Sequence, residues 1–373
     1  MLQTLLRTFP LTCYGSVHGA ASGSISSMDK QDASAKKLDA LIQDRLGETI
    51  KSVEPIEDGV NSLTLKISCM SGRTLLSKIY INRPGDSTDR LGTEFRALEF
   101  LWENDIRNVP EPLVSDAGSN TGVYSFIEGK KLKPGEVAEA EVDNAAAFVN
   151  ELHGLRNAPG ADGLPHAKES CFTLAAYLKV MDERLKRLRG LDAKDEAEKA
   201  LSDFLTGRFM PKYDRACERL RSGAQEAGIG LEAELPANER ILSQSDFGFQ
   251  NILERSDGGL SFIDFEYFGW DDPAKLISDF YLEPAVPVPA NLRLRFLEAL
   301  SPFDDRSGEL RVRLGLVYPV LALKWCLIML NVFLHNPMMY NTKDLLARLE
   351  RADARLKALR EEFEAGIFPL DKE

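Results

Sequence analysis

The sequence predicts an α+β protein of two lobes, a β-rich N-terminal lobe and a mostly helical C-terminal lobe. The chain has 373 residues, which is enough for two sizeable cores. Short alternating strands fill the region up to residue 127, whereas helical periodicity dominates beyond it. Glu128-Gly129 lies where the pattern changes. We therefore place the lobes at residues 33–127 and 128–373.

The composition limits the classes of partner. A net charge of -12 argues against nucleic acid or an anionic membrane surface as the main partner. It is compatible with phosphate chemistry, which can use local cations and a metal ion. The five cysteines are scattered, odd in number and form no CxxC pair, so we expect reduced thiols in a cytoplasmic protein. The sequence leaves the oligomeric state open.

Two apolar segments resemble membrane signals, and we interpret neither as one. The first lies in residues 1–28, where Arg7, Thr8 and Pro10 break the apolar run. We expect a disordered leader over residues 1–32, and the sequence does not tell whether residues 1–28 belong to the mature protein. The second, 314–334, contains a proline and a lysine, so we expect buried core helices there.

The N-terminal lobe begins with an amphipathic helix over 34–46 and continues as a β-meander. Periodicity predicts strands at 50–56, 63–67, 74–81, 113–114 and 122–127, and a helix over 89–104. The loop 57–62 between the first two strands contains Gly, Asn and Ser, and its backbone amides are suited to cover phosphates. Taken alone, this loop is typical of an ordinary hairpin.

Lys78 is the first candidate functional residue. It shares a strand face with Leu76 and Tyr80, and a lysine in such company usually extends its ammonium group to solvent. Glu94 offers an alternative, because it lies beside the buried stripe of the following helix. A strand lysine that meets a helix glutamate is how kinases hold a lysine against polyphosphate.

The stretch 241–281 carries the strongest chemical signal. Asp246 is followed five residues later by Asn251, and a short hairpin then leads to Asp264. If Asp257 and Gly258 form the centre of a two-residue turn, Asn251 faces Asp264 across the ladder. An amide oxygen and a carboxylate on one face suit magnesium, which accepts a few oxygen ligands.

Together these residues supply the roles that phosphoryl transfer needs. Asp246 would accept the hydroxyl proton, Asn251 and Asp264 would hold Mg²⁺, and Lys78 would steady the phosphates. By contrast, Asp272 precedes Pro273, a pair typical of a helix N-cap.

These motifs resemble the aminoglycoside phosphotransferase and choline kinase superfamily, which has the protein-kinase-like fold. The motif Gln244-Ser245-Asp246, followed by Asn251, is similar to the family's catalytic loop His-Gly-Asp-x4-Asn. Ile263-Asp264-Phe265-Glu266 is similar to its metal loop. The resemblance covers about residues 50–334. It implies that Asp246 is the base and that Asn251 and Asp264 bind magnesium.

The resemblance also implies a nucleotide site in the N-terminal lobe. Lys78 and Glu94 would hold the phosphates, Gly59 and Asn61 match the family's nucleotide loop, and the backbone of Ser125, Phe126 and Ile127 would meet the adenine. The nucleotide would be ATP, with GTP left open.

Two departures from the family pattern stand out. Gln244-Ser245 replaces His-Gly, and Leu276 stands where the family has an aspartate in the helix after Asp-Pro, with Asp279 one turn later. The family's acceptors range from antibiotics to choline and sugars. The acids Asp271 and Glu266 favour a cationic or polyhydroxylated acceptor.

We therefore predict a small-molecule kinase that uses ATP and Mg²⁺ to phosphorylate a hydroxyl of an aminoglycoside-, choline- or sugar-like acceptor. The departure at Gln244-Ser245 leaves an alternative open, a pseudokinase that binds a nucleotide or a partner without transfer. A helical interaction module without nucleotide is a third interpretation.

Overall fold

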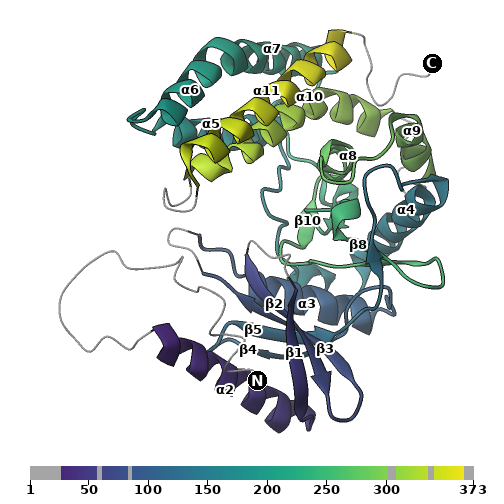
Figure 1. The fold of residues 1–373 in the computed structure, drawn as a ribbon. Helices are drawn as coiled ribbons and strands as arrows, with labels where there is room; N and C mark the ends of the chain where they lie inside the picture. Colours follow the sequence, from purple (N-terminus) through teal and green to yellow (C-terminus); the bar gives the residue numbers. More distant parts are fainter. Residues whose placement is uncertain (1–26, 57–60, 83–85, 301–307, 335–339, 365–373) are drawn as a thin grey trace. The chain divides into compact units, whose positions relative to one another are not determined.

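The computed structural model describes residues 27–364 except 57–60, 83–85, 301–307 and 335–339. This part of the chain forms two compact units. The first unit comprises the chain up to Gly129 together with Ser261–Tyr267, and the second comprises Lys130–Leu260 and the residues from Phe268 onward. The first unit is rich in strands and the second is mostly helical, which confirms the predicted α+β class (Figure 1).

The first unit is built on a five-stranded antiparallel sheet of order β1-β2-β3-β5-β4. Its strands are β1 (Ile50–Ile56), β2 (Ser62–Cys69), β3 (Thr74–Tyr80), β4 (Pro112–Asp116) and β5 (Thr121–Ser125). Alternating apolar residues predict these strands well, because every second side chain enters a core. The predicted last strand is too long, since β5 ends at Ser125 and leaves Phe126 and Ile127 in the connection that follows.

Helices cover both faces of this sheet. The helix α2 (Ser27–Leu46) contributes Leu38 and Ile42 to a core with Ile67, Leu75 and Val123. The opposite face, which carries Lys78, is covered by α3 (Arg90–Glu103), whose N-cap is Asp89. Since α2 begins at Ser27, residues 27–32 of the predicted leader lie in this helix, and residues 1–26 lie outside the described residues.

The second unit contains eight α-helices among its described residues. They are α4 (Glu139–Gly154), α5 (Leu174–Arg189), α6 (Glu196–Phe204), α7 (Met210–Glu226), α8 (Pro273–Leu282), α9 (Ala290–Ala299), α10 (Glu309–Met329) and α11 (Thr342–Glu364). The central helix is α10, which packs against α5, α7, α8 and α11 (Figure 1). Among the described helices, α10 alone is long and apolar enough to cross a membrane, and 72% of its apolar window is buried within the fold. It is therefore explained as a core helix.

Short strands position the predicted catalytic loop. Antiparallel pairing joins β7 (Ile241–Ser243) to β10 (Gly269–Asp271), and Ser243 lies opposite Gly269. The loop that begins at Gln244 therefore leaves one end of this two-stranded ladder. The other strand of the ladder, β10, leads into α8. A 3-10 turn over Phe249–Asn251 then leads into β8 (Ile252–Glu254).

The turn after β8 differs from the prediction. Gly258 donates its N–H to the carbonyl of Arg255, and Arg255 donates its own to the carbonyl of Gly259. The loop therefore has three residues, Ser256 to Gly258, with Gly258 at φ +79°. This longer loop shifts the register by one residue, so the predicted direct opposition of Asn251 and Asp264 is wrong.

Candidate active site

Lys78 lies at the centre of the first unit's sheet. Its Cα partners are Thr64 on β2 and Gly122 on β5. Because side chains alternate across a strand, Lys78 points to the α3 face together with Tyr80. There Nζ donates to both carboxylate oxygens of Glu94 at 2.9 Å. The strand lysine and the helix glutamate therefore meet as the sequence predicts.

A second acid approaches the same ammonium group. Nζ of Lys78 donates to Oδ1 of Asp264 at 2.7 Å. Burial alone would lower the pKa of Lys78, but Asp264 and Glu94 outweigh burial and raise this pKa above its ordinary value. Two acids from separate segments of the sequence thus share one buried, permanently charged lysine.

Two tyrosines to which the sequence analysis gave no functional role support Glu94. The hydroxyl of Tyr80 donates to Oε2 of Glu94 at 2.5 Å and lies 2.8 Å from the hydroxyl of Tyr124. Burial is the main cause that raises the pKa values of both tyrosines, so both stay protonated. Tyr80 lies two residues after Lys78, so both side chains point to the same face of the strand, and this could be seen in the sequence. Its partner on β5 was not visible there, because strand order is needed to bring Tyr124 beside it.

The segment Ser261–Tyr267 belongs to the first unit, although we had assigned it to the helical lobe. Backbone hydrogen bonds explain its position: Phe262 donates its N–H to the carbonyl of Asn108, and Phe265 donates to Oε1 of Glu94. Asp264 adopts φ +72°, a left-handed conformation that aspartate tolerates better than most residues. This backbone conformation lets one short segment contact α3 and present the Asp264 carboxylate to Lys78.

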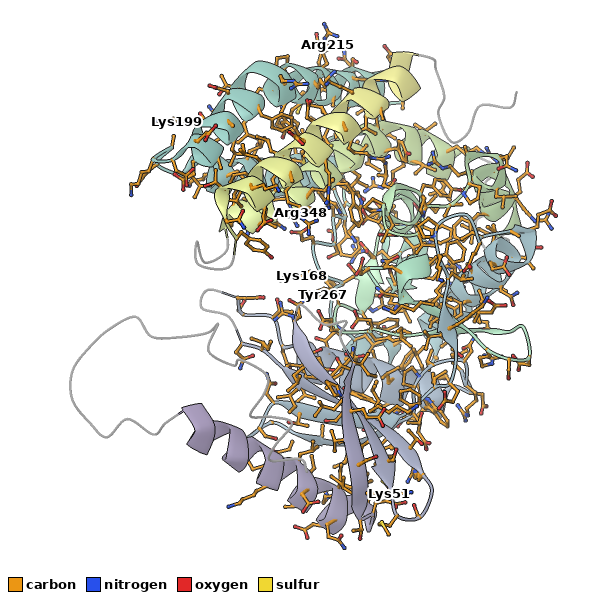
Figure 2. All side chains as sticks on the ribbon, viewed as in Figure 1. Lys51, Lys168, Lys199, Arg215, Tyr267 and Arg348 are labelled. Atoms are coloured by element: carbon orange, nitrogen blue, oxygen red, sulfur yellow. The ribbon has the colours of Figure 1, made fainter. Side chains whose placement is uncertain are left out.

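Three carboxylates gather in the first unit. Glu94, Asp264 and Glu266 each place a carboxylate oxygen within 4.8 Å of the others, a set able to hold a metal ion. Burial, with Asp264 next, raises the pKa of Glu266 to about 7. Asn61 donates from Nδ2 to Oε1 of Glu266 at 2.7 Å and to the hydroxyl of Tyr267 at 2.9 Å. Tyr267 is labelled in Figure 2 at the end of this segment.

The predicted nucleotide-loop and hinge residues are only partly described. Gly59 lies outside the described residues. Asn61 is described, and its side chain binds Glu266 and Tyr267 as given above. Ser125 exchanges hydrogen bonds with Glu111: its N–H donates to the carbonyl, and its Oγ accepts from the N–H of Glu111. The N–H of Ser125 is thereby occupied, so it is not a donor for an adenine ring.

Asp246 and Asn251 lie together in the second unit. Nδ2 of Asn251 donates to Oδ2 of Asp246 at 3.2 Å and to its carbonyl oxygen at 2.9 Å. Nε2 of Gln250 donates to Oδ1 of Asp246 at 3.2 Å. Two amides thus fix the orientation of the Asp246 carboxylate. Since the amide nitrogen of Asn251 is engaged, its Oδ1 is the atom left to face a cation.

The acids that follow the segment Ser261–Tyr267 are neutralised inside the second unit. Asp271 is fully buried, with Oδ2 2.7 Å from Nζ of Lys275. Asp272 caps α8, as its position before Pro273 predicts. Its carboxylate also pairs with Arg313 at 2.6 Å. Asp279 binds Lys324. With Glu266 buried as well, these acids do not form a negative surface, and the sequence-based argument for a cationic acceptor loses its support.

A family model for the phosphotransferase enzyme family matches residues 52–310, well over half of the chain. The chain belongs to this family. The match covers both the Lys78–Glu94–Asp264 cluster and the loop with Asp246 and Asn251. Members of this family are small-molecule phosphotransferases, so the predicted class of enzyme is confirmed. A comparison with curated proteins gave no match.

Solved structures share the fold at low sequence identity. A spectinomycin phosphotransferase, APH(9)-Ia, in complex with ADP and spectinomycin is 13% identical, with TM-score 0.57 and coverage of 88% of this chain and 93% of its own. A choline/ethanolamine kinase family protein from Mesorhizobium loti is 20% identical, with TM-score 0.56 and coverage of 88% and 94%. ADP-bound aminoglycoside phosphotransferase APH(2'')-Ib is 15% identical, with TM-score 0.55 and coverage of 86% and 96%. At these identities the likeness concerns the fold.

Proposed function

We propose that this phosphotransferase moves the γ-phosphoryl group of ATP to a hydroxyl group of a small molecule, with Asp246 as the base. One observation carries the proposal: Lys78 binds Glu94 and Asp264 at the same time, at 2.9 and 2.7 Å. A lysine that is held this way is oriented and charged before any nucleotide arrives. The complexes of two fold relatives with ADP support the choice of an adenine nucleotide.

Lys78 would bind the non-transferred phosphates, since it is the buried cation that Glu94 and Asp264 share. Asp264 would supply carboxylate oxygens for Mg²⁺, and Glu94 and Glu266 lie close enough to it to complete an oxygen-rich set. Asn251, whose amide nitrogen is engaged by Asp246, would supply an amide oxygen. Both donor types suit Mg²⁺. When bound, the ion neutralises charge on the phosphates during transfer.

Asp246 would orient the acceptor hydroxyl and take its proton. The amide groups of Gln250 and Asn251 donate to its two carboxylate oxygens, so the carboxylate is fixed in direction before the acceptor binds. Such preorganisation is where much of the rate enhancement in phosphoryl transfer arises, because the protein performs little covalent chemistry itself.

The acceptor belongs to the aminoglycoside-, choline- or sugar-like compounds that this family's fold serves. The buried acids Asp271, Asp272 and Asp279 are all paired with cations, so they offer no site for a positively charged acceptor. We therefore test uncharged polyhydroxylated compounds beside aminoglycosides and choline, without preference for either charge class.

The test is ADP formation from ATP and Mg²⁺ with pooled acceptors, for the wild type beside Asp246→Asn and Asp192→Asn. Asp192 lies in an exposed surface ion pair with Lys194, so its variant controls for the loss of one carboxylate. We expect a pool that accelerates ADP formation in the wild type and in Asp192→Asn but not in Asp246→Asn. Normal turnover in Asp246→Asn would refute the assignment of the base.

A second outcome would favour a protein that binds nucleotide without transfer. In that case ADP and Mg²⁺ raise the melting temperature of the wild type, since a ligand selective for the folded state stabilises it. No acceptor pool would then accelerate turnover. The replacement of the family's His-Gly by Gln244-Ser245 is the feature that keeps this alternative open.

A further inference from the structure

Lys275 is a buried lysine that the roles above do not use. It lies on α8 with 2% of its side chain exposed. Nζ is 2.7 Å from Oδ2 of Asp271 and 3.5 Å from Oδ2 of Asp279, which lie four residues before and four residues after Lys275. Burying a cation is costly even when it is paired, so a buried lysine calls for an explanation beyond stability.

Lys275 is not needed to neutralise Asp279. Lys324 on α10 lies 3.0 Å from Oδ1 of Asp279, and Nε1 of Trp325 donates to the same oxygen at 2.9 Å. This leaves Asp271 as the principal counter-charge of Lys275. Together with Asp279, Asp271 raises the pKa of the lysine despite burial, which keeps Nζ protonated and able to donate.

The third partner of Lys275 is Ser245, the residue directly before Asp246. Nζ donates to Oγ of Ser245 at 3.3 Å. The same Oγ donates to the carbonyl of Lys168 at 3.0 Å, and the N–H of Ser245 donates to Oγ of Ser243 at 2.9 Å. Both hydrogen-bonding functions of the Ser245 hydroxyl are therefore used. Lys168 is labelled in Figure 2.

Ser245 needs these anchors because of its backbone. Its φ is +67°, the left-handed region that costs energy for any residue with a Cβ. Glycine occupies this position in the family pattern, and it adopts such angles freely. A serine persists there only when its surroundings determine its conformation. The hydroxyl contacts to Lys168 and Lys275 are the surroundings that the structure provides.

We propose that Lys275 is a positioning residue that, through the Ser245 hydroxyl, holds the catalytic loop so that Asp246 keeps its orientation. The proposal rests on the proposed function as far as Asp246 is the base. Asp271 is the last residue of β10 and lies opposite Ile241, the first residue of β7, so Lys275 links the start of the catalytic loop at Ser245 to the strand pair that precedes this loop. The residue determines rate through Asp246 and does not itself touch nucleotide or acceptor.

The matched control is Lys324. Lysines 275 and 324 are both buried in the second unit, and both contact Asp279, but Lys275 is the one that binds Ser245. Lys275→Met and Lys324→Met therefore remove comparable buried charges. Ser245→Gly is the second variant, because it removes the hydroxyl, relieves the left-handed strain and leaves the buried ion pairs intact.

The first readout is amide hydrogen exchange of the peptide covering residues 244–251, which needs no substrate. We expect exchange about tenfold faster in Lys275→Met than in Lys324→Met, the effect of losing one hydrogen bond from a charged donor. Adding Lys275→Met to Ser245→Gly should accelerate exchange of this peptide no further. Equal exchange in the two lysine variants would refute the proposal, as would full additivity with Ser245→Gly.

The second readout is ADP formation from ATP and Mg²⁺, with water or the best acceptor pool. We expect Lys275→Met to lower kcat about tenfold while KM for the nucleotide stays within about twofold, and Lys324→Met to keep kcat. Equal losses of kcat in both would refute the role in transfer. If the wild type forms no ADP, the proposed function fails, and the exchange comparison still decides whether Lys275 holds the loop. If Lys275→Met does not fold, Ser245→Gly alone must show faster exchange at residues 244–251, and unchanged exchange would refute the proposal.

Discussion

Removing one hydroxyl, in Tyr80→Phe, tests whether the tyrosine pair supports the Lys78–Glu94 cluster. The Tyr80 proton goes to Glu94, so Tyr124 must donate its own proton to Tyr80. The variant costs a hydrogen bond to a charged group and leaves the Tyr124 hydroxyl, 1% exposed, without its acceptor. These losses total about 3 kcal/mol. Tyr124→Phe removes a single neutral hydrogen bond, worth about 1 kcal/mol.

Hydrogen exchange of the α3 amides measures the cost within the first unit. A loss of about 3 kcal/mol corresponds to exchange roughly a hundredfold faster in Tyr80→Phe, and about 1 kcal/mol to a change of about fivefold in Tyr124→Phe. The double variant should cost less than the sum, because its second substitution removes the hydroxyl that the first left unpaired. Equal costs for the two single variants, or strict additivity, would refute this account of the pair.

Three further predictions concern packing, pH and the metal ion. Gly269→Ala should destabilise the second unit by about 3 kcal/mol, because the added Cβ would lie 2.2 Å from the carbonyl oxygen of Pro165. The control is Gly207→Ala, where the added Cβ meets open space. Thermal unfolding compares the two variants. Burial lowers the pKa of His153 to about 4 from 6.5, so the unfolded state binds more protons between these values. Urea unfolding at several pH values should show the wild type losing up to about 3 kcal/mol relative to His153→Gln as pH falls from 6.5 to 4. ADP and Mg²⁺ should raise the melting temperature of the wild type, and EDTA should reduce this rise to the smaller rise seen in Asp264→Ala. A full rise in Asp264→Ala would contradict a metal role for Asp264.

Local patterns in the sequence predicted much of the fold. The alternating Leu63, Leu65 and Ile67 locate β2, because Leu65 and Ile67 enter the core that α2 covers while the residues between them point away from it. The pair Asp272-Pro273 predicts the start of α8, because the carboxylate caps the first turn and proline fits the next position. Both signals depend on neighbours in sequence, and the structure confirms both.

The turn after β8 shows where such signals become ambiguous. Asp257-Gly258 indicates a positive φ, and Gly258 has one. The same dipeptide serves a two-residue loop and a three-residue loop that ends in a left-handed glycine. The choice between them shifts every later pairing by one residue. The glycine was therefore identified correctly, and the register that followed from it was not.

The charged residues of β10 and α8 explain why the sequence misled us about the acceptor. Asp271, Lys275 and Asp279 are spaced four residues apart, so their mutual pairing is visible in the letters. Lys324 lies far along the chain, and only the packing of α10 against α8 brings it to Asp279. Of the two acids that the sequence analysis counted toward the acceptor, Asp271 is paired with Lys275 in the fold, and Glu266 is buried. The charge preference of the acceptor site therefore depends on side chains that stay exposed, and uncharged acceptors are as compatible with this buried network as cationic ones.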